Sequence, residues 1–118
     1  MTRRAALAAL ALLGLSVGAQ GADTVVNVYN WSDYISEDVV KAFEAETGIR
    51  VVYDVYDGNE VLEAKLLAGR SGYDLVFPSA RPFAANHIAA KLYGPLDLAA
   101  LPGRRHLEPA IMADLAQI

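Results

Sequence analysis

Hydrophobic and polar positions along the chain follow two alternating periods. Short apolar runs rich in β-branched and aromatic residues predict strands over residues 25–29, 50–56 and 74–77. Apolar positions one helical turn apart follow each of these runs. They predict helices over residues 36–48, 59–69 and 82–92, and a last one that begins at 109. The chain therefore reads as strand and helix in regular alternation.

End signals support these helices. Ser36 and Asn59 are expected as N-caps, because their side chains can accept a bond from a free backbone N–H. Gly48 and Gly69 suit the left-handed position that ends a helix. Pro109 suits a first helical position, where no N–H donor is needed.

The alternation predicts an α/β fold built on a mainly parallel sheet with flanking helices, since a parallel strand pair needs a crossover. Ligands of such open sheets bind beyond the carboxyl ends of the strands. Three loops follow strand ends here: residues 30–34, 57–59 and 78–81. We expect all three at one edge of one sheet.

The first loop has unusual chemistry. Trp31, the chain's single tryptophan, is followed by the hydroxyl of Ser32, the carboxylate of Asp33 and the phenol of Tyr34. Two rings could attract an alkylammonium by about 0.5–2 kcal/mol each, and a carboxylate could add a hydrogen bond of about 1.5–3 kcal/mol. The alternative is that both rings pack beneath the following helix.

Other candidates each have a structural alternative. Ser79 could bond a ligand, cap the helix after it, or both. Asp57 could face a ligand, but Asp-Gly-Asn is also a turn sequence. Asp74 is expected to be structural, and His87 and His106 to lie at the surface.

Catalytic and metal chemistry is not indicated by any motif. The chain has no cysteine nucleophile, no Gly-x-Ser-x-Gly elbow and no phosphate-binding glycine loop. Its two histidines lack metal-ligand spacing. We therefore expect a non-enzyme with no catalytic residue, no metal and no cofactor.

The first 22 residues resemble a secretory signal peptide. Arg3 and Arg4 precede an apolar run over residues 5–17, and small residues at 18–22 suit cleavage at about 19–22. The segment could instead be an uncleaved anchor or a buried helix, and the arginine pair fits either Sec or twin-arginine export. Without cysteine the chain can carry neither a disulfide nor a lipid anchor, so we expect a free periplasmic protein.

The net charge is −4, from ten Lys and Arg against fourteen Asp and Glu in 118 residues. No basic run suggests a nucleic-acid partner. An acidic surface favours cationic ligands by steering, and it serves solubility equally well.

Three motifs resemble the periplasmic putrescine- and spermidine-binding proteins of polyamine ABC transporters. They are YNWSDYI at 29–35, FEAETGIRVVYDVYDGNEVLEAKL at 43–66 and YDLVFPSA at 73–80. The resemblance implies a two-lobe fold that closes on its ligand. Residues 23–118 would be part of the first lobe, with the second lobe absent from this chain. It further implies a polyamine ligand, a membrane permease as partner, and a monomer.

The resemblance also implies a ligand site. Its first-lobe contacts fall on Trp31, Ser32, Asp33, Tyr34 and Ser79, with Asp33 binding one terminal ammonium. The Ser32-Asp33 pair resembles the putrescine-preferring members.

Arg81 departs from the family pattern, because a cation beside the site would repel a dication. It could point outward, pair with an acid such as Asp57, or indicate a ligand other than a simple diamine. Spermidine, agmatine or another small cation thus stay open as ligands. Two hypotheses of a different kind also stay open: a catalytic or sensory α/β module that uses Asp33, and a truncated fragment that binds nothing.

Overall fold

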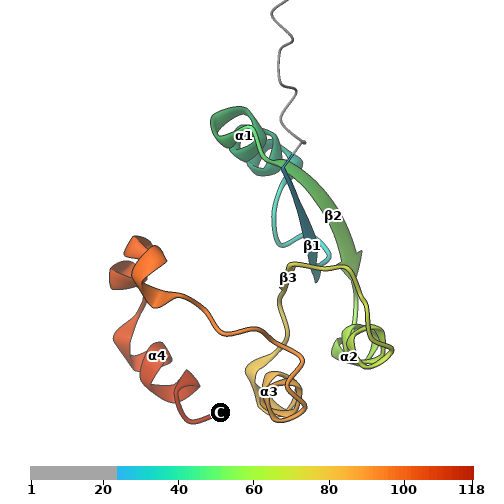
Figure 1. Ribbon diagram of the computed structural model, residues 1–118, viewed down its shortest axis with the longest axis vertical. Helices are drawn as coiled ribbons and strands as arrows, with labels where there is room; N and C mark the ends of the chain where they lie inside the picture. Colours follow the sequence, from blue (N-terminus) through green and yellow to red (C-terminus); the bar gives the residue numbers. More distant parts are fainter. Residues whose placement is uncertain (1–23) are drawn as a thin grey trace, which may run out of the picture.

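The sheet has three parallel strands. The computed structural model describes residues 24–118, so the signal-peptide prediction and the division at residue 23 lie outside the described residues. Strand β1 (Val25–Trp31) lies between β2 (Arg50–Tyr56) and β3 (Leu75–Val76) (Figure 1). All seven residues of β1 pair with β2 in parallel register, from Val25 opposite Arg50 to Trp31 opposite Tyr56. The predicted α/β fold with a parallel sheet is confirmed.

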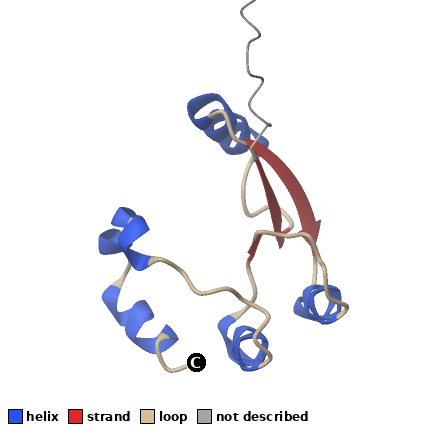
Figure 2. Ribbon diagram, in the orientation of Figure 1, coloured by secondary structure: helices blue, strands red, loops and turns tan. Residues whose placement is uncertain are grey.

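Four α-helices accompany the strands in the described part of the chain: α1 (Glu37–Thr47), α2 (Asn59–Leu67), α3 (Ala85–Ala89) and α4 (Pro109–Leu115) (Figure 2). Successive β1 side chains point to opposite faces of the sheet. Val26 and Val28 line a groove together with residues of α1, whereas Tyr29 packs with Leu62 of α2. Helices α1 and α2 therefore lie on opposite faces.

The core is on the α2 face. Tyr29, Tyr56 and Leu62 are buried together. Half-buried side chains surround them: Trp31, Leu66, Tyr73 and Val76. Three of the seven side chains are tyrosines, so this core carries hydroxyl groups that need hydrogen-bond partners.

Helix ends match the expected signals only in part. Gly48 is left-handed (φ 70°) and its N–H bonds to the carbonyl of Glu44, as predicted for a C-terminal glycine. Ser36 occupies the N-cap of α1 but makes no side-chain cap bond. The prediction that Asn59 caps α2 is wrong: Gly58 is the N-cap, and Asn59 is the first helical residue.

The third strand and the helix after it are shorter than predicted. Only Leu75 and Val76 pair with β1, where residues 74–77 were expected. The helix expected over 82–92 is confined to Ala85–Ala89, after a kinked turn, η1, at Ala80–Ala84. Arg81 is extended there (φ −126°, ψ 138°), because a residue before proline is pushed out of the helical region.

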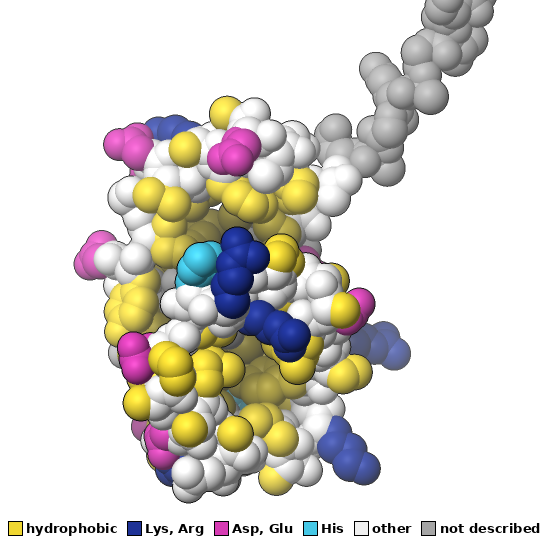
Figure 3. Space-filling view, turned by 90° about the vertical axis from the view of Figure 1, so that its left-hand side faces the viewer, with side chains coloured by type: hydrophobic (Ala, Val, Ile, Leu, Met, Phe, Trp, Pro, Cys, Tyr) yellow, Lys and Arg dark blue, Asp and Glu magenta, His cyan; other side chains and the backbone are white. Residues whose placement is uncertain are grey.

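The C-terminal segment packs little against the sheet. It holds two short turns, η2 (Leu98–Ala100) and η3 (Pro102–His106), followed by α4, which begins at Pro109 as predicted. Residues 94–117 are all exposed. Apolar side chains gather around hollows on the face that Figure 3 presents, with cationic side chains among them. Within residues 24–118, no helix combines the length and apolar character needed to cross a membrane.

Candidate ligand-binding site

Trp31 ends the central strand. It was expected in a loop, but it is the last residue of β1 and pairs with Tyr56. The N–H of Ser32 continues the ladder with a 3.1 Å bond to the Tyr56 carbonyl. Asp33 then turns the chain with a left-handed backbone (φ 63°), a conformation that Asp tolerates better than most residues. Ser32, Asp33 and Tyr34 are exposed at the carboxyl edge of the sheet.

The indole of Trp31 is fixed by polar and aromatic contacts. Its Nε1 donates to the Phe77 carbonyl at 2.8 Å, and the Tyr56 hydroxyl donates to the same oxygen at 2.5 Å. The Trp31 and Tyr56 rings pack at 4.9 Å between centroids. Tyr34 stacks more loosely on Trp31, at 6.2 Å, and is 70% exposed. The alternative that both rings pack beneath α1 is therefore wrong for Tyr34.

Tyr56 is a site residue that the sequence analysis missed. Burial, helped by the charge of Tyr93, raises the pKa of Tyr56 from 10.0 to about 12. The phenol is thus protonated at neutral pH and remains a donor to the Phe77 carbonyl. Tyr56 ends the strand that was predicted over residues 50–56, and nothing in that strand pattern indicates a bond to the Phe77 carbonyl.

Rings continue from Tyr56 across the sheet. Tyr29 meets Tyr56 edge-on at 4.8 Å and stacks on Tyr73 at 4.5 Å. The Tyr73 hydroxyl donates to Asp54 at 2.7 Å. Burial first, and then this carboxylate, raises the pKa of Tyr73 to about 12. The strand end that carries Trp31 therefore rests on a continuous aromatic layer.

Ser79 is held by Asn59. Its backbone N–H donates to Asn59 Oδ1 at 2.9 Å, and its Oγ accepts from Asn59 Nδ2 at 3.0 Å. The helix-capping alternative is not what is found, since Ser79 makes no side-chain cap bond. Asp57 is exposed at the neighbouring strand end. Asp74 is structural as predicted, accepting from the backbone N–H and the side-chain amide of Asn27.

Arg81 pairs with Asp114, and not with Asp57. Its Nη1 lies 3.3 Å from each carboxylate oxygen of Asp114, and both side chains are about half exposed. This ion pair joins the turn after β3 to α4. Part of the positive charge near Ser79 is thereby neutralised.

The prediction that His87 lies at the surface is wrong. It is 1% exposed, and its Nδ1 lies 2.6 Å from the Tyr93 hydroxyl. Nε2 lies 3.6 Å from a carboxylate oxygen of Glu63, so the ring connects α3 with α2. His106 is exposed as predicted. No three His, Cys, Asp or Glu side chains within residues 24–118 are grouped closely enough to hold a metal ion.

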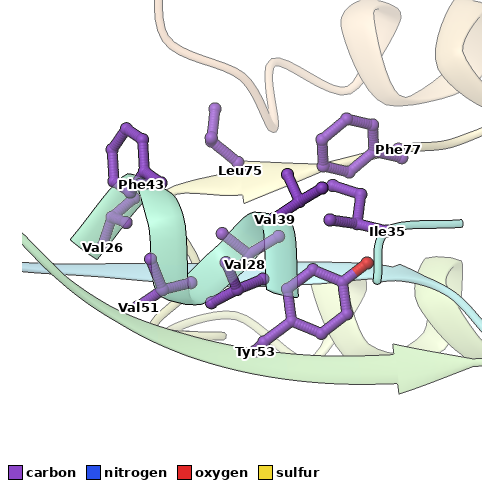
Figure 4. A pocket seen from close by; sticks show the side chains of 10 residues that line it. Val26, Val28, Ile35, Val39, Phe43, Val51, Tyr53, Leu75 and Phe77 are labelled. Atoms are coloured by element: carbon purple, nitrogen blue, oxygen red, sulfur yellow. The ribbon is translucent and has the colours of Figure 1, made fainter. Parts of the chain in front are cut away.

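A separate groove lies on the opposite face of the sheet, between α1 and the strands (Figure 4). It has a volume of about 210 Å³, and all ten of its lining residues are apolar or aromatic; they include Phe43, Tyr53 and Leu75. With no charged group it is a poor place for a cation. The candidate site is the edge that carries Trp31, Asp33, Tyr34 and Ser79.

Comparisons with curated proteins place this geometry in context. No protein-family model matches the chain. It is 56% identical over 111 residues to the putrescine-binding periplasmic protein SpuD of Pseudomonas aeruginosa, and 49% identical over 112 residues to PotF, of the same description, from Escherichia coli. These matches cover 92% and 94% of the chain. The chain spans about 30% of the length of either relative.

Solved structures agree. The Tp0655 (TpPotD) lipoprotein of Treponema pallidum superposes with a TM-score of 0.73 at 37% identity, over 78% of this chain and 28% of that one. The spermidine/putrescine substrate-binding protein PotD of Streptococcus pneumoniae gives 0.70 at 32% identity, over 74% and 27%. The fold thus matches part of a lobe of ABC-transporter substrate-binding proteins. Within that class, the chain is homologous to the periplasmic putrescine- and spermidine-binding proteins, and the resemblance predicted from its motifs is confirmed.

Proposed function

We propose that this chain provides one wall of a putrescine-preferring polyamine site in the binding component of an ABC importer. One observation carries the proposal. The exposed carboxylate of Asp33 and the exposed ring of Tyr34 lie two and three residues after a fixed indole, Trp31, at the edge where parallel sheets bind ligands. Over 111 residues, the chain is 56% identical to a protein described as putrescine-binding.

The chemistry of the edge suits an alkyldiammonium. Asp33 would accept a charge-assisted hydrogen bond from one terminal ammonium, and Ser32 or Ser79 would offer a hydroxyl oxygen. Trp31 and Tyr34 would cover the methylene chain and attract the charge with their ring faces. Since Arg81 pairs with Asp114, its charge is less of an obstacle to a dication than its position in the sequence suggests.

These contacts are too few for tight binding. Two rings at about 0.5–2 kcal/mol each and one carboxylate bond at about 1.5–3 kcal/mol give less than the roughly 8.2 kcal/mol of a micromolar complex. Association itself costs further free energy. We therefore expect groups outside residues 24–118 to complete the site, as in a two-lobe protein that closes on its ligand.

The protein would act in the periplasm as a monomer and deliver its ligand to a membrane permease, with no enzymatic step and no nucleic-acid partner. The relatives SpuD and PotF are described as periplasmic, which supports the location.

A chimera tests the ligand assignment. Residues 24–118 would replace the matching segment of PotF, and calorimetry would measure the binding of putrescine, spermidine and agmatine. We expect putrescine to bind tightest. Asp33→Asn should weaken it at least about tenfold, because a charge-assisted bond to a carboxylate is lost. Asparagine suits this test because it tolerates the left-handed backbone of residue 33.

Asp38→Asn is the matched control, since it also removes an exposed carboxylate, from the first turn of α1. It should leave the affinity unchanged. A chimera that melts cooperatively and yet binds none of the three amines would overturn the proposal. Preference for spermidine or agmatine would reassign the ligand.

A further inference from the structure

Asn59 and Ser79 form a reciprocal pair of hydrogen bonds, and its chemistry fixes the orientation of the amide. A backbone N–H can only donate, so the atom of Asn59 that faces the Ser79 N–H is Oδ1. Nδ2 must then face Ser79 Oγ, at 3.0 Å. The Ser79 oxygen therefore acts as an acceptor toward Asn59. It keeps one further lone pair and its own proton for other partners.

The pair bridges the carboxyl edge of the sheet. Asn59 begins α2, shortly after β2, and Ser79 follows β3. Because the strand order is β2-β1-β3, the bridge joins the two outer connections across the end of β1, where Trp31 leads into Asp33. Asn59 thus links both flanks of the candidate site.

The main chain alone does not hold Ser79. β3 pairs with β1 only through Leu75 and Val76, and Ser79 lies three residues beyond the last pair. Between them, the Phe77 carbonyl is held by Trp31 and Tyr56. The Ser79 carbonyl accepts from the Ala84 N–H within the following turn, at 3.0 Å. Across the edge, the bonds that reach the N–H and the hydroxyl of Ser79 are those of Asn59.

The cap of α2 leaves Asn59 available for this contact. Gly58 takes the N-cap position and has no side chain to satisfy the helix. The Asn59 side chain, one residue later, is directed across the edge to Ser79 and not to its own helix. An asparagine serving as the cap would be bonded to N–H groups two or three residues along.

We propose that Asn59 is the positioning residue of the polyamine site. It holds Ser79 in place and leaves one lone pair of the Ser79 hydroxyl oxygen for an ammonium group. Asn59 acts through Ser79 and does not itself touch the ligand. This inference rests on the proposed function, because it assigns a role within the same site.

The bond can be tested without ligand. In the full chain, we expect the Ser79 amide proton to exchange at least about tenfold faster in Asn59→Ala than in the unaltered protein, because it loses its acceptor. Glu60→Ala, at the exposed neighbouring position of α2, is the control and should leave the rate unchanged. An unchanged Ser79 rate in Asn59→Ala would overturn the inference.

The role in binding is tested by a double-mutant cycle in the PotF chimera. Asn59→Ala and Ser79→Ala should each weaken putrescine about tenfold, and the double variant should be little worse than either alone. Additive losses would overturn the inference, because they would mean that Asn59 acts independently of Ser79. A merely structural role predicts that additivity.

Rescue by a near-isostere gives a second readout. In Asn59→Asp, the carboxylate can accept from both the N–H and the hydroxyl of Ser79, so Ser79 keeps its place. We expect an affinity within about threefold of the unaltered chimera at about 0.5 M NaCl, where exposed charges are largely screened. An Asn59→Asp variant as weak as Asn59→Ala would contradict the positioning role.

The two proposals fail in distinguishable ways. If the unaltered chimera binds putrescine but the cycle is additive, Asn59 loses its role while the site stands. If the unaltered chimera folds but binds no polyamine, the proposed function fails and the role of Asn59 falls with it.

Discussion

The carboxyl edge of the sheet and the C-terminal segment are built in different ways. At the edge, Trp31, Tyr56 and Ser79 bond to residues at least 20 positions away along the chain. In residues 94–117, the backbone bonds of the turns span three or four residues, and every side chain is exposed. The ion pair between Arg81 and Asp114 is a half-exposed link between the two regions.

The difference explains where the site can be. A binding edge needs groups held in a fixed arrangement before the ligand arrives, since ordering them afterwards costs affinity. Bonds between distant elements provide that order around Trp31, whereas local turns do not constrain a segment relative to the sheet. We therefore expect substitutions that remove buried contacts at the edge to lower the free energy of unfolding strongly. Substitutions within residues 94–117 should change it little.

The largest expected effect on stability comes from the buried cluster of Tyr29, Tyr56 and Leu62, on which the edge rests. Leu62 is fully buried beside Tyr29 and Tyr56, so Leu62→Ala should lower the free energy of unfolding by about 2–5 kcal/mol. Leu98→Ala removes the same atoms from a residue that is 54% exposed and should change it by less than about 0.5 kcal/mol. Urea unfolding measures both. Equal losses would remove the distinction between the two regions.

Alkaline pH should weaken the edge next. Burial is the leading cause that raises the pKa of Tyr56 and of Tyr73 from 10.0 to about 12. The folded state therefore holds protons that the unfolded state releases between these values, and stability that is complete below pH 10 falls as the pH rises toward 12. Urea midpoints over this range measure the loss.

Substitution identifies the groups responsible for that loss. Tyr56→Phe should lower stability by about 1 kcal/mol at neutral pH, for one lost hydrogen bond. It should also reduce the alkaline loss to the part that Tyr73 causes. Tyr34→Phe, at an exposed ring, should leave the neutral stability unchanged. A slope in Tyr56→Phe as steep as in the unaltered protein would mean that other groups cause it.

The smallest expected effect is at the link between the regions. Asp114→Asn removes the half-exposed ion pair with Arg81, and such pairs contribute about 0–1 kcal/mol. We expect little change in the urea midpoint but faster amide exchange in α4. Lys41→Ala, which breaks an exposed pair within α1, should leave α4 exchange unchanged. Unaltered α4 exchange in Asp114→Asn would show that the pair does not hold this helix.

Much of the fold was predictable because it depends on local patterns. Apolar runs and helical periodicity identified all three strands and the four main helices, since each element must bury one face. Gly48 and Pro109 marked helix ends because their backbone preferences are intrinsic. Parallel topology then predicted that the loops after the strands share one edge of the sheet. Asp33 and Tyr34 are exposed at that carboxyl edge.

The remaining features depend on contacts between distant residues. Arg81 finds Asp114 33 positions later, and nothing near Arg81 in the sequence distinguishes that acid from Asp57. His87 is buried by Tyr93 and by Glu63 of another helix, whereas its own neighbours resemble a surface pattern. The role of Tyr56 depends on where β3 ends, and a two-residue strand has too weak a pattern to fix its limits.

The most direct test of the central claim is a crystal structure of the PotF chimera with putrescine. The account predicts one ammonium within hydrogen-bond distance of the Asp33 carboxylate, with the methylene chain along the Trp31 indole and Ser79 still bonded to Asn59. A bound diamine that contacts neither Trp31 nor Asp33 would contradict it.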